Sequence, residues 1–428
     1  MLVKSSRRSL GAQFEWLWRA FAISTFGTFI AFDAFPLVAI IVLHASPGEV
    51  AALAATGRLA GAALALPLGP WVERRQKRSV MIAMDLIRCS TLLSIPLALI
   101  SGWLSFAQLL VVSVIVAAAN ITFKAASGAY LKALVRPDEL LVANGRFEST
   151  TWTATAIGPV IGGAAIGAFG SVTTIVADAV SYLLSAMAIR AIHQPEPLPT
   201  HANPLRLKVG DVFDGWRTIW GHPNLRLLFL NTILVNGLIM ATAPLVAVLM
   251  LGHLGFAPWQ YGLAFGVPCV GGFIGSRLVG RIVTRFGQRK VMLVAGALRA
   301  CWSVGLAFIG PGLAGIALVI AIQFGLVTCI GIFNPLSATY QLEQIETSRV
   351  ARTLAAWSVA GNATIAVMIF IFGLVANITN PRIAIAIAGV IMLTSPLLLS
   401  RFIGAKQQER ESTRDGCAIS PVLRQEDT

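Results

Sequence analysis

The stretch GPWVERRQKR, from Gly69 to Arg78, places four cations and one carboxylate in a single short segment. The chain around it is 56% hydrophobic and only 12% charged. Soluble domains carry about 25% charged residues, so this composition predicts a protein that faces lipid rather than water. Within such a chain, a short and highly charged segment predicts a loop at the membrane edge, between two apolar helices.

A second copy of this stretch lies 211 residues further on, where Gly280 begins GRIVTRFGQR. The repeat continues after it, since RSVMIAMDLIRC, ending at Cys89, matches RKVMLVAGALRAC, ending at Cys301. Before it, PLVAIIVL at Pro36 matches PLVAVLML at Pro244. Repetition over this length predicts two similar halves in parallel orientation, which is one architecture of secondary transporters.

Apolar segments long enough to cross a bilayer recur along the whole chain. A hydrocarbon core of about 30 Å needs about 20 residues of helix. By this measure we expect twelve spans, at 16–43, 49–70, 79–101, 104–128, 143–169, 171–191, 225–251, 259–281, 290–310, 312–338, 352–377 and 382–403. The predicted fold is an all-α membrane protein of 12 transmembrane helices in two six-helix pseudo-repeats. We expect the halves at 1–192 and 224–403, a central loop at 193–223 with an amphipathic segment, and a disordered tail at 404–428.

The cations are distributed unevenly between the two ends of the predicted bundle. Arg382 alone falls in a loop on one side, while Arg58, Arg88 and Arg299 fall within spans. The rest of the 33 Lys and Arg residues lie at or near the other side, with both termini. Positive loops mark the cytoplasmic side, so we expect both termini in the cytoplasm of a bacterium whose inner membrane holds the protein. The net charge of +14 then reflects topology, and no nucleic-acid partner is expected.

In these motifs the chain resembles the major facilitator superfamily, whose loop motif reads G-x-L-a-D-r-x-G-r-r. The first copy has Glu73 in place of the Asp and Gln76 in place of the second Gly; its matching residues are Gly69, Arg74, Lys77 and Arg78. The second copy has Thr284 at the acidic place; its matching residues are Gly280, Arg285, Gly287 and Arg289. The resemblance covers nearly the whole chain and implies the fold of that family.

A second motif, g-x-x-x-G-P-x-x-G-G, is typical of antiporters in this family. The chain has GPVIGG, formed by Gly158, Pro159, Gly162 and Gly163. Pro159 should bend the helix, and the glycines should let another helix approach closely. In the family this bent helix lies where the halves meet on the outer side. The stretches AYLKALVRPDELLVANG, VADAVSYLLSA and DGWRTIWGHPNLR look like the branch of enterobactin-type siderophore exporters and macrolide efflux pumps, which implies proton-driven export.

We interpret the loop motif as a conformational latch. Glu73 and its basic neighbours should join the inner ends of helices across the boundary between the halves and hold an outward-facing state. Asp85 and Arg88, three residues apart on one helix face, should brace this loop. The alternative is a solvated positive loop that only sets topology.

Two charges are expected near the middle of the membrane. Asp33 lies thirteen residues before the outer turn near Ser46, and Arg58 lies twelve after it, so both should stand at one depth on neighbouring helices. Ionisable groups at that depth are usually functional. We expect Asp33 to carry the coupling proton while Arg58 favours its charged form; a purely structural ion pair is the alternative.

Amides in the helices that line the cavity in this family are the candidates for substrate contact. They are Asn120, Asn236, Gln323 and Asn334. An unpaired amide in hydrocarbon is costly, so each should face water or bond across helices. We therefore predict proton-coupled export of a small amphiphilic compound, a siderophore or drug, without enzymatic activity, cofactor, metal or required oligomer. The rival predictions are a proton-coupled importer of a nutrient or siderophore, and a non-pumping lipid facilitator or membrane sensor.

Overall fold

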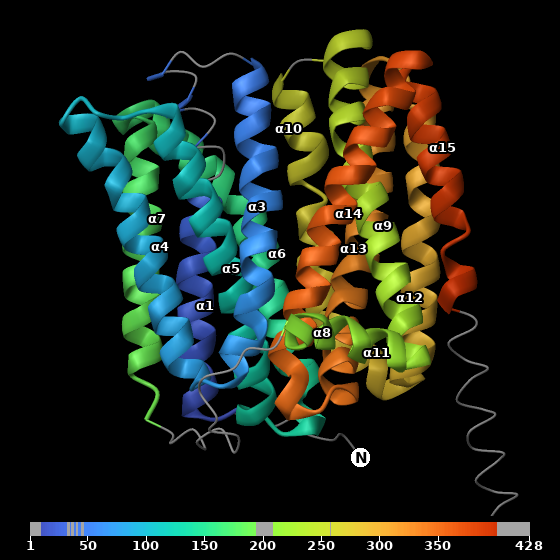
Figure 1. Cartoon of the computed structure of the whole chain (residues 1–428). Helices are drawn as coiled ribbons and strands as arrows, with labels where there is room; N and C mark the ends of the chain where they lie inside the picture. The colour runs from blue at the N-terminus through green and yellow to red at the C-terminus, as the bar shows by residue number, and fades with distance from the viewer. Residues whose placement is uncertain are drawn as a thin grey trace, which may run out of the picture.

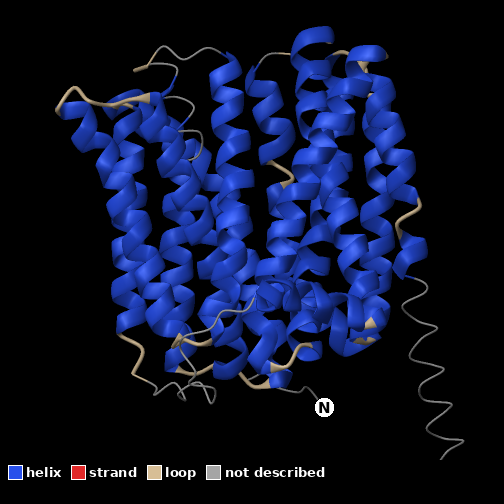
Figure 2. Cartoon of the chain, viewed as in Figure 1, coloured by secondary structure: helices blue, strands red, loops and turns tan. Residues whose placement is uncertain are grey.

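The computed structural model is a bundle of long helices packed side by side (Figure 1). It describes residues 10–31, 35, 38–39, 42–43, 47–193, 209–256 and 258–399. Over these residues the chain forms helices joined by short loops, as Figure 2 shows. The all-α fold predicted from the apolar segments is confirmed.

The N-terminal half begins the bundle. Its helices are α1 (Ala12–Ile30), α3 (Pro47–Glu73), α4 (Lys77–Ile100), α5 (Phe106–Leu134), the short 3-10 helix η1 (Pro137–Glu139), α6 (Leu140–Phe169) and α7 (Ser171–Arg190). Each predicted span of this half overlaps one of these helices. The chain turns sharply after α3 at the charged segment, as expected, because α4 begins only four residues after α3 ends.

The C-terminal half repeats this arrangement. Its elements are α9 (Pro223–Ala247), the π-helix η2 (Val248–His253), α10 (Pro258–Gly266), α11 (Cys269–Phe286), α12 (Gln288–Trp302), η3 (Ser303–Phe308), α13 (Gly312–Gln344), η4 (Thr347–Arg349), α14 (Val350–Ile378) and α15 (Pro381–Leu393). The predicted span at 259–281 is divided into α10 and α11 just before Cys269. Pro268 stands at this break, where it lacks the N–H that would continue the helix.

The described part of the chain contains nine helical stretches that are long and apolar enough to cross a membrane. Large apolar side chains cover the outside of the bundle; Ile100, Val160 and Ile378 are 84%, 72% and 83% exposed. Such a surface suits lipid, because lipid tails impose no cost on exposed hydrocarbon. The membrane class is therefore confirmed, while the number of twelve spans and the exact bounds of the halves stay predictions.

One end of the bundle carries the α3–α4 turn, the α11–α12 turn and α8 (Val209–Gly221), and we call it the basic end. In Figure 1 it lies at the bottom, with α8 across it. The helix α8 comes from the predicted central loop and packs on α9, where Trp216 meets the ring of Phe229 edge-on at 6.1 Å. The remainder of that loop and the tail at 404–428 lie outside the described residues.

The hydrophobic core shows how the two halves are joined. One cluster of buried residues spans both halves and includes Phe14 and Ile189 from the first half, with Phe229 and Val350 from the second. Away from the basic end, the buried side chains form two further clusters, one within each half. Within the described residues, the halves therefore share a core toward the basic end and have separate cores at the other.

Candidate functional site

A cavity of about 380 Å³ lies between the two halves. Helices α1, α5 and α6 of the first half supply most of its wall, and α13 and α14 of the second half complete it. Much of the lining is aromatic or hydroxyl-bearing, and its amides come from Asn120, Asn144 and Gln341. The charged lining residues are Arg88 and Lys124. Concave sites of this volume, mostly apolar with a few polar groups, are typical of small-molecule binding.

The four predicted amides fall in different places. Asn120 lines the cavity, as predicted. Asn334 lies on α13, and its Nδ2 donates a hydrogen bond of 2.8 Å to Glu148 Oε1 on α6. Asn236 on α9 and Gln323 on α13 are not among the residues that line the cavity. The structure therefore brings two of the four to the boundary between the halves.

Glu148, near the start of α6, has a specific position at the boundary between the halves. Its Oε1 accepts hydrogen bonds from Asn334 of the other half and, at 2.9 Å, from Trp152 Nε1 one turn along α6. Four residues earlier, Asn144 Nδ2 donates to Thr339 Oγ1 on α13 at 2.9 Å. Two polar bonds thus tie α6 to α13 beside the cavity.

Asp85 and Arg88 form a buried ion pair, and their side chains are 0% and 3% exposed. Ser185 Oγ on α7 donates to Asp85 Oδ2 at 2.7 Å. The guanidinium of Arg88 lies over the rings of Tyr182 and Phe123, at 4.1 Å and 4.5 Å from their centroids. The pair ties α4 to α7, and Arg88 reaches the cavity wall, while its expected role in bracing the loop motif stays a prediction.

A third carboxylate, Asp178 on α7, lies close to this pair. Its Oδ1 accepts hydrogen bonds from Thr28 Oγ1 at 3.3 Å and from Ser181 Oγ at 3.4 Å. Thr28 also shares a hydrogen bond of 2.8 Å with the hydroxyl of Tyr182, and Thr28 lines the cavity. Asp178 is therefore held by α1 and by its own helix, behind the cavity wall.

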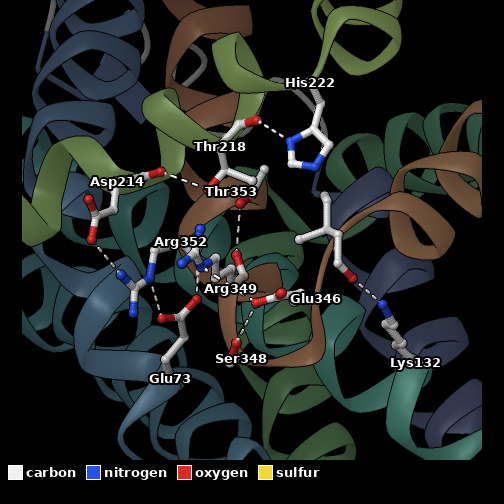
Figure 3. Close-up of polar contacts among 11 residues, drawn as sticks. Glu73, Lys132, Asp214, Thr218, His222, Glu346, Ser348, Arg349, Arg352 and Thr353 are labelled. Atoms are coloured by element: carbon white, nitrogen blue, oxygen red, sulfur yellow. Dashed lines mark hydrogen bonds and ion pairs between the residues drawn. The ribbon is translucent and has the colours of Figure 1, made fainter.

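The loop motif makes its main contact with the second half, as Figure 3 shows. Glu73 accepts hydrogen bonds from the backbone N–H of Arg352, at 3.1 Å, and from the Nε of the same residue. The Nη1 of Arg352 donates to Asp214 Oδ2 on α8 at 2.9 Å. The Glu73 side chain is only 6% exposed. One arginine at the start of α14 thus joins the end of α3 to α8.

The remaining residues of the first motif support this junction. Gly69 lets α14 approach, because a Cβ at this position would lie 3.1 Å from the Cα of Arg352. Lys77 Nζ donates to the backbone oxygen of Glu73 at 3.0 Å, and Arg74 lies in the same turn. Arg78 Nη2 donates to the carbonyl of Arg190 at 2.6 Å, at the end of α7.

The second motif makes different contacts. Thr284 Oγ1 donates to the carbonyl of Arg281 within its own helix at 2.8 Å, and Arg285 lies over the ring of Phe286. A Cβ on Gly280 would meet nothing within 4 Å. Gly287 has a φ of 82°, a left-handed conformation that favours glycine, and Arg289 follows at the start of α12. The hydrogen bond of Thr284 and the ring contact of Arg285 thus lie within the C-terminal half.

The GPVIGG motif lies elsewhere than expected. A Cβ on Gly158 would stand 3.0 Å from the carbonyl oxygen of Phe29, and one on Gly162 would stand 3.0 Å from the carbonyl carbon of Ile30. Both neighbours belong to α1, so the motif packs α6 on α1 inside the N-terminal half rather than between the halves. Pro159 lies within α6, and a Cβ on Gly163 would meet nothing within 4 Å.

The proposed proton pair could be placed only in part. Asp33 lies outside the described residues. Arg58 lies in α3, and its side chain is not described. Their pairing therefore stays a prediction.

Sequence reasoning missed three residues that the structure brings into the site. Lys124, which the charge distribution assigned to the basic end, lines the cavity. Lys124 follows Asn120 by four residues, so the two lie on one helix face, and this spacing could have predicted that both face the cavity. Arg352 and Asp214 complete the junction with Glu73, but nothing in their local sequence indicates partners 279 and 138 residues away along the chain.

Comparison with known proteins agrees with this architecture. The sequence profile of the Major Facilitator Superfamily matches residues 17–341. Among solved structures, the chain resembles a bacterial homologue of the iron transporter ferroportin in an outward-facing state, with a TM-score of 0.77 and 13% identity, over 92% of this chain and 100% of that one. It also resembles the E. coli fucose:proton symporter FucP, with a TM-score of 0.69 and 14% identity, over 92% and 99% of the two chains. At such low identity these likenesses show the fold alone.

Curated relatives are matched over a shorter region. The multidrug efflux pump Tap of Mycobacterium tuberculosis and that of Mycobacterium bovis are each 28% identical to this chain over 171 residues. The match spans 39% of this chain and 40% of the length of those pumps. The profile match covers most of the chain and agrees with the all-helical architecture and the central cavity, so the protein belongs to the Major Facilitator Superfamily of membrane transporters.

Proposed function

We propose that the protein exports a small amphiphilic compound in exchange for protons, by alternating access, across the bacterial inner membrane. The observation that carries this proposal is the shared core of the two halves toward the basic end, beside a cavity lined from both. If the basic end faces the cytoplasm, as its cations predict, this arrangement corresponds to a state closed toward the cytoplasm.

Alternating access requires that this closure can be broken. Besides the shared apolar core, polar contacts close this end, and they include Glu73 with Arg352, Asn144 with Thr339, and Glu148 with Asn334. A transporter needs its two states to differ by only a few kcal/mol, so that substrate and protons can shift the balance. Each polar contact at a membrane edge contributes only a modest free energy, so the difference between the two states can stay small.

Two carboxylates are the candidates for proton coupling. Asp33, with Arg58, is proposed from its expected depth in the membrane. Glu148 is proposed from its contacts, because it accepts a hydrogen bond from the opposite half. A proton on Glu148 would weaken it as an acceptor, since a neutral carboxyl accepts hydrogen bonds less strongly than a carboxylate. Protonation would then loosen the bond to Asn334 and favour separation of the halves.

The direction and the substrate class rest on similarity. The relatives matched over 171 residues are multidrug efflux pumps, which supports export of drug-like compounds. The motifs that resemble siderophore exporters extend the proposal to siderophores. Phe21, Phe123 and Phe147 in the cavity wall suit the apolar part of such a molecule.

The test is accumulation of candidate siderophores and drugs in cells with and without the protein, each with and without an uncoupler. We expect the protein to lower accumulation only while the proton gradient stands. Raised accumulation would instead indicate a proton-coupled importer, and an effect that survives the uncoupler would indicate a facilitator. With a sensor, accumulation would be the same with and without the protein, whether or not the uncoupler is present.

The carboxylates are tested in the same assay. Asp33→Asn and Glu148→Gln should each abolish proton-dependent efflux if that residue carries the proton. Asp138→Asn is the matched control, because Asp138 is an exposed acid paired only locally with Arg136. Normal efflux by both Asp33→Asn and Glu148→Gln would refute proton coupling through either residue.

A further inference from the structure

The charged groups of the cavity wall all have the same sign. Among the described residues that line it, Arg88 and Lys124 are cations, and there is no carboxylate. Glu148, Asp85 and Asp178 lie nearby but outside the lining. A ligand in this cavity therefore meets positive charge directly and negative charge only behind the wall.

The two cations differ in how they are neutralised. Arg88 is 3% exposed and is paired with Asp85, so its charge is already compensated. Lys124 is exposed within the cavity, and the described residues offer it no carboxylate within ion-pair distance. Its Nζ carries three hydrogen-bond donors and a compact charge.

An uncompensated cation inside a membrane protein is unfavourable and is normally retained for a purpose. Water in the cavity can solvate Lys124 while the cavity is open. When a bound molecule displaces that water, the charge needs a counter-ion, because a desolvated and unpaired charge is strongly disfavoured. A negatively charged group on the bound molecule would meet that need.

The surroundings of Lys124 define the rest of such a molecule. Asn120 lies one turn before Lys124 and Ser127 about one turn after it, so both add polar groups on the same face of α5. The rings of Phe21, Phe123 and Phe147 supply apolar surface in the same cavity. The volume of about 380 Å³ limits the bound part to a small molecule.

We propose that the transported compound is an amphiphilic organic anion, whose negative group binds Lys124 while its apolar part contacts the phenylalanine rings. This inference rests on the proposed function and adds the charge of the substrate to it. The cavity also lies close to the junction of Glu73 with Arg352. A Cβ on Gly128, one turn beyond Lys124, would collide with Leu354, which is two residues from Arg352.

The test is binding to the purified full-length protein in nanodiscs, with three probes that share one aromatic body: 2-naphthoate, 2-naphthalenemethanol and 2-naphthylmethylamine. One charge-assisted hydrogen bond contributes enough to expect the carboxylate to bind roughly ten- to a hundredfold more tightly than the alcohol. Lys124→Met should remove this preference, so that the carboxylate binds no more tightly than the alcohol. Lys124→Arg should keep the preference, because it keeps the charge.

Lys290→Met is the control variant, since Lys290 is an exposed lysine at the start of α12, outside the cavity. It should behave as the wild type. Binding of the alcohol shows that each variant is folded. The inference is overturned if wild-type protein binds carboxylate and alcohol equally, if it prefers the amine, or if Lys124→Met retains the preference for carboxylate.

Failure of the inference and failure of the proposed function are distinguishable. Proton-dependent export of neutral or cationic amphiphiles that is indifferent to Lys124→Met would refute the anion site and leave the exporter standing. A carboxylate preference that depends on Lys124, without any proton-dependent transport, would support the anion site and refute the proposed exporter.

Discussion

The two halves repeat in sequence, but their charged positions have diverged. In the first half Arg88 is paired with Asp85 one turn away; 211 residues on, Arg299 is fully buried, and Gly296 takes the place equivalent to Asp85. Arg299 donates to Asn231 and lies 3.6 Å from the ring centroid of Phe333, while its Nε and Nη1 have no hydrogen-bond partner among the described residues. The same cation is thus held by a carboxylate in one half and by an amide and a ring in the other.

The loop motifs diverge in the same direction. Glu73 bonds to Arg352 across the halves, whereas Thr284 bonds within its own helix. The 3-10 helices η1 and η4 begin 210 residues apart, so the position equivalent to Arg352 is Val142. The second copy therefore lacks both charges of the junction. The two halves thus share a fold, while the ion pairs of Asp85 with Arg88 and of Glu73 with Arg352 have no equivalent at the matching positions of the second copy.

The largest effect should come from breaking the buried pair of the first half. Asp85→Asn leaves Arg88 without its bonded carboxylate, which should lower the free energy of unfolding by about 3–5 kcal/mol. Arg299→Met breaks no ion pair in the other half and removes a buried charge, so it should cost less. Unfolding in mixed micelles measures both. The double variant Asp85→Asn with Arg88→Met should recover part of the loss; equal costs for Asp85→Asn and Arg299→Met would contradict the contrast between the halves.

The next effect concerns the latch. Glu73→Gln removes the charge that binds Arg352, and we expect proton-dependent transport to fall about tenfold, because the halves no longer close stably at the basic end. Thr284→Ala in the second copy should transport normally. Transport assays with membrane levels measured in parallel separate lost activity from lost insertion. Normal transport by Glu73→Gln would leave the motif only its role in topology.

A smaller effect should follow from crowding the same contact. Gly69→Ala places a Cβ 3.1 Å from the Cα of Arg352, so α3 and α14 must move apart slightly, and transport should fall about fivefold. Gly280→Ala has open space around it and serves as the control. If both variants transport equally, close approach at Gly69 does not matter to the latch.

The smallest effect concerns the turn that follows each motif. Gly287 has a φ of 82°, whereas Gln76 at the equivalent place has a φ of −62° and needs no glycine. Gly287→Ala should therefore lower the free energy of unfolding by about 1 kcal/mol. Gln76→Ala should change it little. Equal costs at the two positions would contradict the conformational reason for the missing glycine in the first copy.

Much of the fold could be predicted because it depends on properties that the sequence displays locally. The length of the apolar segments predicted the helices, and the internal repeat predicted two similar halves. The charged turn was also placed correctly, and Glu73 was identified as the residue that reaches across the boundary. The helices, the repeat and the charged turn need no knowledge of which distant helices meet, whereas the contact of Glu73 across the boundary was expected from resemblance to the family's loop motif.

The site was less predictable because it depends on tertiary contacts. Arg352 looks like an ordinary cation at a helix start, and only packing of α14 on α3 makes it the partner of Glu73. GPVIGG was assigned to the boundary between the halves by analogy, but its close contacts are with α1. Lys124 was counted with the loop cations because hydropathy does not show that a cavity extends along α5.

The most direct test of the latch is the distance between the halves at the basic end. Spin labels at Arg75→Cys and Ser348→Cys, both exposed positions, would report it by double electron–electron resonance in a variant without native cysteines. We predict one short distance for the otherwise wild-type protein and for Thr284→Ala, and a shift to longer distances for Glu73→Gln. An unchanged distribution in Glu73→Gln would contradict the claim that the first copy of the motif holds the halves together.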